Sequence, residues 1–288
     1  MKTLFTPQEL EEKILKGEGL LLAGDEELLR NLPKGNWIGG TIPYFMSEKG
    51  GLCTQEEIQA VTLPDFLGDL RIKAYCPQEI GKIAQDYPEH GISFIVMPGG
   101  SEIHQKYAKE VYNYPQIFNR PLVGWITGIK LEDMAKVSPK VFDGQKREVF
   151  EDKALVLHAS LPENIFAKID IVNIFEQGEG DTFVFLENGF SAKECLVNGE
   201  KRNFAEYVRE KNLDIRLPLV TNLFGSMINT SFQEVREDEV TFYAPVFEGL
   251  EYRQAKAVED YEKEFEKRLS QLQIEPLFSC NCILNYLY

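Results

Sequence analysis

The turn at residues 98–101, Pro-Gly-Gly-Ser, has the residue types that could most directly do chemistry. It joins an apolar segment, residues 92–97, that predicts a buried strand to a segment that predicts a helix. Backbone N–H groups and the helix dipole favour an anionic group at such a helix start. We therefore expect Gly99, Gly100 and Ser101 to contribute to a ligand-binding site. The turn matches neither the dinucleotide nor the P-loop glycine pattern, and a simple helix cap is the alternative role for Ser101.

Ser101 could instead be a nucleophile, with His104 or His158 as its general base. Its surroundings do not form the G-x-S-x-G pattern, and His104 is poorly placed to face it from three residues along the helix. A second enzymatic alternative uses the thiol of Cys280, which would need a depressed pKa to react. We keep a hydrolase or thiol-dependent enzyme as the alternative and favour a protein without catalysis of its own.

Cys280 and Cys282 stand two residues apart and would share one face of a strand, as metal ligands can. The chain has three histidines, and none lies within ten residues of these cysteines or in a zinc-type spacing. We therefore expect no metal and no cofactor. The cysteines are interpreted as buried thiols that pack like small hydrophobic side chains.

A second candidate site is the segment 35–46, where Trp37 precedes a glycine pair and an aromatic run. Its β-branched and aromatic residues predict a strand. A glycine pair inside a strand indicates a bulge or a place where a ligand presses against bare backbone. It equally suits a sheet corner where only glycine fits. We expect Gly39, Gly40 and Thr41 to line the ligand site, with the purely structural role as the alternative.

Strand and helix patterns alternate in the N-terminal half, which predicts a layered α/β scaffold for these residues. Thr6, Pro7 and Glu9 form a helix-start signal with a capping box, and Asp25 can cap a second helix. The expected helices are residues 9–16, 25–30, 78–86 and 102–112, and the expected strands are residues 20–23, a strand from Trp37, and residues 71–76, 92–97 and 121–126.

Strands dominate from residue 140 onward, at 140–144, 153–160, 169–177, 181–187 and 239–244. The turn Gly178-Glu179-Gly180 predicts a hairpin. A short helix is expected at 204–211, and the longest at 252–273, where apolar residues step by three or four. Residues 277–288 are apolar and suit a buried strand or helix, so we expect a terminus docked into the core or a chain clipped at Tyr288.

The composition excludes several partners. The 288 residues carry a formal net charge of −15, which argues against binding to nucleic acid or to anionic membrane surfaces. We find no signal-peptide core and no apolar run long enough to span a membrane. Five cysteines without framework spacing are interpreted as reduced thiols, and we expect a cytoplasmic protein.

The order of segments resembles the FIST family, named for F-box and intracellular signal transduction. The N-terminal part is similar in Ile38-Gly39-Gly40, in Pro121-Leu122-Val123-Gly124 and in Val141-Phe142-Asp143-Gly144. The C-terminal part is similar in Val240-Thr241-Phe242-Tyr243-Ala244-Pro245 and in Leu277-Phe278-Ser279-Cys280. The resemblance implies a sensory domain for a small molecule, an amino acid or related metabolite, and it implies no catalysis.

We therefore predict an α/β protein of two layered parts, residues 1–165 and 166–288, with the second rich in strands. Its function is predicted to be small-molecule sensing or binding in signal transduction. The predicted ligand site contains Gly39, Gly40, Thr41, Gly99, Gly100, Ser101 and Cys280. A scaffold that forms homo-oligomers through the long C-terminal helix is a further alternative.

Overall fold

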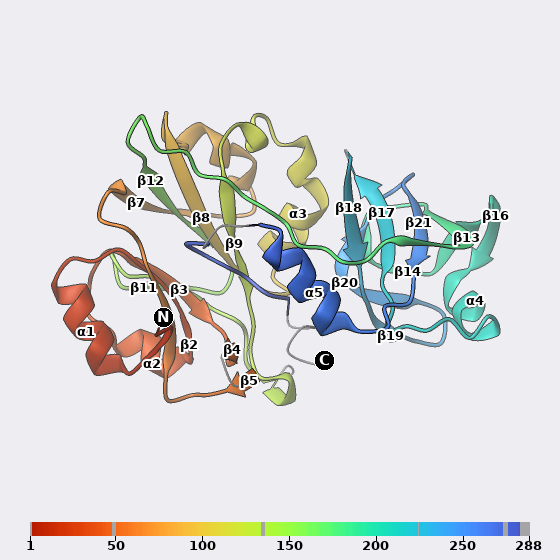
Figure 1. Ribbon diagram of the computed structural model, residues 1–288, viewed down its shortest axis with the longest axis horizontal. Helices are drawn as coiled ribbons and strands as arrows, with labels where there is room; N and C mark the ends of the chain where they lie inside the picture. The colour runs from red at the N-terminus through yellow and green to blue at the C-terminus, as the bar shows by residue number, and fades with distance from the viewer. Residues whose placement is uncertain (1, 48–49, 134–135, 224, 273–275, 283–288) are drawn as a thin grey trace. The chain divides into compact units, whose positions relative to one another are not determined.

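The computed structural model describes all residues except 1, 48–49, 134–135, 224, 273–275 and 283–288 (Figure 1). The chain forms two compact units, unit 1 (Met1–Ile169 and Glu275–Tyr288) and unit 2 (Asp170–Ile274). The fold is mixed α/β, as predicted, with several mixed sheets. The expected division after residue 165 lies close to the observed exit of the chain from unit 1. The C-terminal segment, which was expected in the second part, belongs to unit 1.

The large sheet of unit 1 has the strand order β1-β6-β2-β3-β10-β11. Its two central strands, β2 and β3, are parallel, and its other pairs are antiparallel. Helices α1 and α2 cover its outer face with an apolar core that includes Leu10, Leu29 and Trp37. The bounds are β1 Leu4–Phe5, α1 Pro7–Leu15, β2 Leu20–Gly24, α2 Glu26–Asn31, β3 Trp37–Thr41, β6 Ile58–Thr62, β10 Val141–Asp143 and β11 Glu148–Phe150.

The small sheet of unit 1 has the order β7-β12-β8-β9, with only β8 and β9 parallel. Its inner face packs on the large sheet through a core that includes Ile38, Phe94 and Leu157. Its outer face is covered by α3 and short 3-10 helices. Unit 1 is therefore a four-layer stack of helix, sheet, sheet and helix. The bounds are β7 Gly68–Tyr75, η1 Ile80–Asp86, β8 Gly91–Pro98, α3 Glu102–Glu110, η2 Val111–Asn113, η3 Ile117–Asn119, β9 Leu122–Thr127, η4 Leu131–Asp133 and β12 Ala154–Ser160; β4 Tyr44–Ser47 and β5 Gly50–Cys53 form a separate hairpin.

Unit 2 consists mainly of antiparallel strands around an aromatic core. One sheet has the order β16-β15-β13-β21-β17-β18 and the other the order β14-β20-β19. The rings of Phe183, Phe185 and Phe204 meet edge to face inside it, a preferred aromatic geometry. The bounds are β13 Gln177–Phe185, β14 Gly189–Ala192, β15 Glu194–Val197, β16 Glu200–Asn203, α4 Phe204–Glu210, β17 Leu219–Leu223, β18 Ser226–Thr230, β19 Phe232–Val235, β20 Val240–Val246, β21 Glu251–Ala255 and α5 Tyr261–Ser270.

Helix starts and apolar strands are the best-predicted elements. Thr6 and Glu9 form the capping box of α1, Asp25 caps α2, and Ser101 caps α3. The strands expected at residues 20–23, 92–97, 121–126 and 153–160 are confirmed as β2, β8, β9 and β12. Strand β8 is buried at all eight positions, which explains its continuously apolar sequence.

The predicted helix over residues 252–273 is wrong in its first part. Residues Glu251–Ala255 form β21, and α5 begins only after the Asp260 cap. Tyr252 and Ala255 are buried against the unit 2 core and the β13 and β17 ladders, so tertiary pairing overrides the helical spacing. The remaining helix, α5, has ten residues and buries none of them.

The predicted hairpin around Gly178-Glu179-Gly180 is also wrong. These residues lie inside the single strand β13, where the pairing with β21 shifts register between Gln177 and Thr182. A Cβ on Gly178 would lie 2.8 Å from the Gln254 carbonyl oxygen. The glycines therefore permit a bulge with close backbone approach, which a sequence cannot distinguish from a turn.

The C-terminal segment docks partly into unit 1. The half-buried Phe278 packs against Phe94 and Trp125 in the core between the two sheets. Residues 276–282 form no helix or strand, so the expected regular element is wrong for this part. Residues 283–288 lie outside the described residues. Across the part of the chain that the structure describes, no helix combines the length and apolarity needed to cross a membrane.

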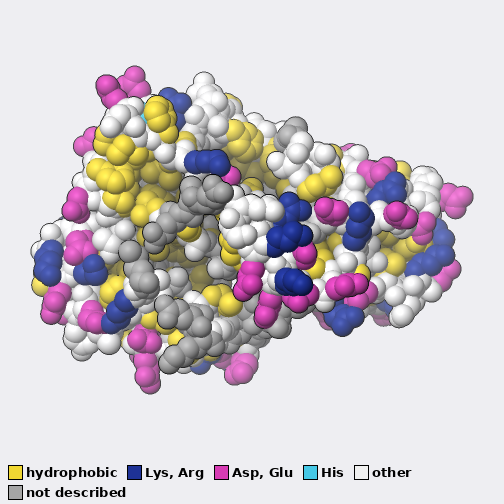
Figure 2. Space-filling view, viewed as in Figure 1, with side chains coloured by type: hydrophobic (Ala, Val, Ile, Leu, Met, Phe, Trp, Pro, Cys, Tyr) yellow, Lys and Arg dark blue, Asp and Glu magenta, His cyan; other side chains and the backbone are white. Residues whose placement is uncertain are grey.

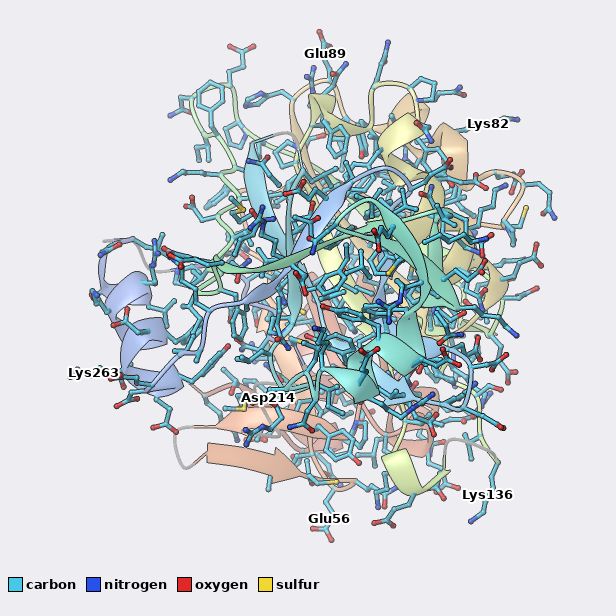
Figure 3. The ribbon with its side chains drawn as sticks, turned by 90° about the vertical axis from the view of Figure 1, so that its right-hand side faces the viewer. Glu56, Lys82, Glu89, Lys136, Asp214 and Lys263 are labelled. Carbon is cyan, nitrogen blue, oxygen red and sulfur yellow. The ribbon has the colours of Figure 1, made fainter. Side chains whose placement is uncertain are left out.

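The surface mixes both signs of charge. On the face shown in Figure 2, Lys and Arg side chains are interspersed with Asp and Glu, and hydrophobic side chains gather over the region of β7 and β12. Figure 3 shows Lys82 of η1 and Glu89, both exposed, extending away from the molecule. Exposed ion pairs among such charges contribute little to stability.

The glycine pair of β3 is packed on both of its faces. A Cβ on Gly40 would lie 2.1 Å from Thr127 Cγ2 and 3.0 Å from Val96 Cγ2, in the inter-sheet core. A Cβ on Gly39 would lie 3.0 Å from the Leu22 carbonyl oxygen, among the residues beneath the helices. Strand β3 keeps its register with both neighbours, so the pair permits close packing of the sheets without a bulge.

We predict that Gly40→Ala lowers the free energy of unfolding by about 1–3 kcal/mol, because the new methyl group overpacks the inter-sheet core. Urea denaturation of the purified variant measures the change. Gly128→Ala is the matched control, since a Cβ there would have no described atom within 4 Å. Equal stability of the two variants would show that the sheets can separate at Gly40 without cost.

Candidate functional site

The structure brings the two glycine sites together around Thr127, the last residue of β9. The Thr127 methyl group lies over Gly40, and its carbonyl oxygen accepts a hydrogen bond from Gly99 N at 3.1 Å. Gly128 N in turn donates to Thr41 O at 2.8 Å. Residues predicted from separate motifs therefore meet at the carboxyl ends of β3, β8 and β9. At Gly39 and Gly40 the side chains of Trp37, Val96 and Thr127 occupy the space that a ligand would need.

Ser101 acts as a helix cap in this arrangement. Its hydroxyl donates to the Pro98 carbonyl oxygen at 2.6 Å and accepts from His104 N at 3.3 Å. The imidazole Nδ1 of His104 accepts from Gly100 N at 3.1 Å. The Ser101 proton is directed at a backbone oxygen, and the imidazole is directed at backbone, so this pair lacks the contact that a nucleophile and its base require.

Cys280 lies two residues beyond Phe278 and is exposed. Desolvation by the surrounding chain, and secondarily Cys282, raises the pKa of its thiol. A raised pKa opposes the thiolate that nucleophilic attack needs. Among the described residues, no three His, Cys, Asp or Glu side chains are grouped in a way that could hold a metal ion.

A cleft of about 480 Å³ lies at the opposite end of β8, on the outer face of the small sheet. Strand β7 lies at the edge of that sheet (Figure 1) and contributes three of the residues that line the cleft. The lining residues are Asp69, Leu70, Arg71, Pro88, His158 and Ser160.

A β-bulge positions the acidic group of the cleft. The pairing of β12 with β7 shifts register between His158 and Ser160, and Asp69 adopts the left-handed conformation with φ 48°. Aspartate tolerates this conformation better than most residues. The Ser160 hydroxyl donates to Asp69 Oδ2 at 3.3 Å. Bulges commonly redirect a side chain beside a functional site, and this one places Asp69 at the cleft.

A chain of hydrogen bonds supports the cleft wall from behind. Ser93 Oγ lies 2.8 Å from His158 Nδ1, and Tyr75 Oη lies 3.2 Å from His158 Nε2. The Tyr75 hydroxyl donates to Asp86 Oδ2 at 2.8 Å, and Lys73 Nζ lies 2.6 Å from the same oxygen. Since Tyr75 donates to Asp86, His158 Nε2 carries the proton and Nδ1 accepts from Ser93.

The electrostatics agree with a neutral His158. Burial, aided by the positive charge of Arg71, lowers its pKa to about 4. Burial and the bond to Asp86 raise the pKa of Tyr75. For Asp86, desolvation acts to raise the pKa, but the bonds from Lys73 and Tyr75 outweigh it and lower the pKa overall. The network therefore holds a neutral imidazole between a hydroxyl and a phenol.

This network positions groups and does not assemble a nucleophile. Ser93 is completely buried and His158 is 2% exposed, so no substrate carbonyl can reach the serine without rearrangement. The groups that face solvent in the cleft are Asp69 and Arg71. Arg71 Nη2 donates to the Asp86 carbonyl oxygen at 2.6 Å, which orients the guanidinium. The arrangement suits binding of a ligand that carries both signs of charge.

The sequence pointed to part of this site. His158, named from the sequence as a possible base for Ser101, is instead a buried histidine with partners at both ring nitrogens. Asp69, Arg71 and Ser160 were missed. The available signal was the alternation of polar and apolar residues through Asp69-Leu70-Arg71-Ile72-Lys73, which marks a strand with one polar face but does not reveal a cleft.

The fold is that of a two-unit α/β protein with a polar cleft on one sheet face of unit 1. Residues 5–288 match the family described as "Family of unknown function (DUF6976)", and the chain belongs to this family. No curated protein and no solved structure matches the chain.

We predict that His158 makes stability depend on pH between 6.5 and 4. The pKa of His158 in the folded protein is about 4, below the ordinary value of 6.5. The imidazole therefore binds a proton more readily in the unfolded chain. The contribution of His158 to the free energy of unfolding is fully present above pH 6.5. It is lost as the pH falls through 4, and the total loss is about 3 kcal/mol. Urea denaturation at several pH values measures it. His158→Gln, which cannot titrate, should show a flatter profile; identical profiles would contradict the assignment.

Proposed function

We propose that this protein is a binding module for a small zwitterionic metabolite, an amino acid or a close relative, without catalysis of its own. The observation that carries the proposal is the cleft that holds Arg71 and Asp69, two groups of opposite charge. A guanidinium pairs well with a ligand carboxylate, and a carboxylate pairs with a ligand ammonium group.

The remaining lining suits the rest of such a ligand. Leu70 and Pro88 offer apolar surface, and the Ser160 hydroxyl offers a polar contact. His158 contributes a neutral wall, because both of its ring nitrogens are engaged inside the protein. Most small-molecule sites combine apolar lining with a few fixed polar groups in this way.

The sequence resemblance to the FIST family supports a sensory role in signal transduction. All five cysteines are free, which suits the reducing cytoplasm where we place the protein. Self-association stays a prediction of the sequence, and it must now rely on the ten residues of α5.

This proposal places the ligand in the cleft and not at the glycine segments that the sequence predicted. The residues Gly39 to Thr41 and Gly99 to Ser101 meet at the carboxyl ends of the strands, whereas the cleft lies at the other end of β8. We assign amino-acid binding to the cleft because it combines open volume with opposite charges.

We expect native mass spectrometry, followed by calorimetry with the twenty amino acids, to identify at least one ligand of wild-type protein. Arg71→Gln should then weaken binding at least about tenfold, because a charge-assisted hydrogen bond is lost. Arg71→Lys keeps the charge and should weaken it less. Arg71→Gln binding as tightly as wild type would refute the assignment.

The ligand's own groups provide a second control. If leucine binds, 4-methylpentanoate lacks only its ammonium group and should bind more weakly to wild type. In Asp69→Asn the difference between the two affinities should shrink, since the carboxylate that binds the ammonium group is removed. No binding by any amino acid would contradict the proposed function as a whole.

A further inference from the structure

The inner face of the edge strand β9 carries two buried polar groups that have no hydrogen-bond partner among the described residues. These are Trp125 Nε1 and Thr127 Oγ1, on side chains that are 9% and 2% exposed. Buried N–H and O–H groups are nearly always paired, because leaving one unpaired costs the full desolvation energy of the group. Two such donors, two residues apart on one strand face, call for an acceptor.

The side chain that covers Trp125 is Phe278, which belongs to neither sheet. The Phe278 ring lies 6.0 Å from the Trp125 ring and 6.1 Å from the Phe94 ring, centre to centre. Phe278 is half-buried and belongs to a segment that forms no helix or strand. Trp125 is thus covered by a side chain that can leave without breaking a sheet ladder.

The apolar surroundings of the two donors favour an uncharged ligand. The side chains that pack here include Phe94, Val96, Ile42 and Val123, all apolar. An ionised carboxylate would be buried without a counter-ion, which is costly, in a chain of net charge −15. An uncharged carbonyl oxygen can accept both hydrogen bonds without that penalty.

We propose that this place is a second ligand site, for an uncharged molecule that carries a carbonyl oxygen on an apolar body. The oxygen accepts from Trp125 Nε1 and Thr127 Oγ1, and the apolar body takes the position of the Phe278 ring. The site shares no lining residue with the cleft of Arg71 and Asp69, so it stands independently of the proposed function.

Acetophenone and ethylbenzene test the proposal, because they share a skeleton and differ in the carbonyl oxygen. ¹⁵N-labelled protein gives two indole signals, and Trp37 Nε1, which donates to the Pro33 carbonyl oxygen at 3.0 Å, is the internal reference. Titration should move the Trp125 signal and leave Trp37 unchanged. Acetophenone should bind roughly three- to tenfold more tightly than ethylbenzene. No movement of the Trp125 signal, or equal affinities, overturns the proposal.

Two variants sharpen the result. Thr127→Val keeps the shape of the side chain and removes the hydroxyl, so the preference for acetophenone should fall. Phe278→Ala removes the ring that the ligand displaces and should tighten binding by about tenfold; Phe118→Ala, at a residue 68% exposed elsewhere in unit 1, is its control and should change nothing. Full preference retained in Thr127→Val, or no tighter binding in Phe278→Ala, overturns the proposal.

Discussion

The burial of β8 on both faces is the constraint on which the rest of unit 1 depends. All eight of its residues are buried, with Phe94 and Val96 in the inter-sheet core and Ile95 and Met97 beneath the helices. A polar residue in such a strand must find a partner inside the protein. Ser93 finds it in His158 Nδ1 on the neighbouring strand. Because the Tyr75 hydroxyl donates to Asp86, His158 Nε2 donates to Tyr75, and Nδ1 is left to accept from Ser93.

Among the described residues, buried polar groups have hydrogen-bond partners at one end of the small sheet and lack them at the other. At the cleft, each buried group has its partner, and the network ends at Asp86 and Lys73 near the surface. Such a network is rigid because removing one member leaves another unpaired. At the β9 edge, Trp125 and Thr127 lack partners among the described residues. A fully paired network favours one fixed cleft geometry. Donors that are unpaired among the described residues would instead gain a hydrogen bond from an added acceptor, as the proposed second site requires.

Local signals in the sequence predicted local structure well. Thr6, Asp25 and Ser101 were identified as helix caps because capping needs only a side chain and the next turn of backbone. β21 was missed, since Tyr252 has helical spacing to its neighbours and only the distant strands β13 and β17 make it a strand residue. The cleft was missed for the same reason. Asp69, Pro88 and Ser160 are separated by many residues, and a bulge that no motif marks brings Asp69 to the cleft.

Both proposed ligand positions involve residues close in sequence to a point where the chain passes from one unit to the other. The chain leaves unit 1 after Ile169, and Ser160, at the end of β12, belongs to the cleft. Between them, His90 Nε2 lies 3.0 Å and 2.8 Å from the carbonyl oxygens of Pro162 and Ile165, which ties the exit segment to unit 1. The chain returns to unit 1 shortly before Phe278, which covers Trp125. A ligand at either proposed position would therefore contact a segment of the chain that continues, in sequence, into unit 2.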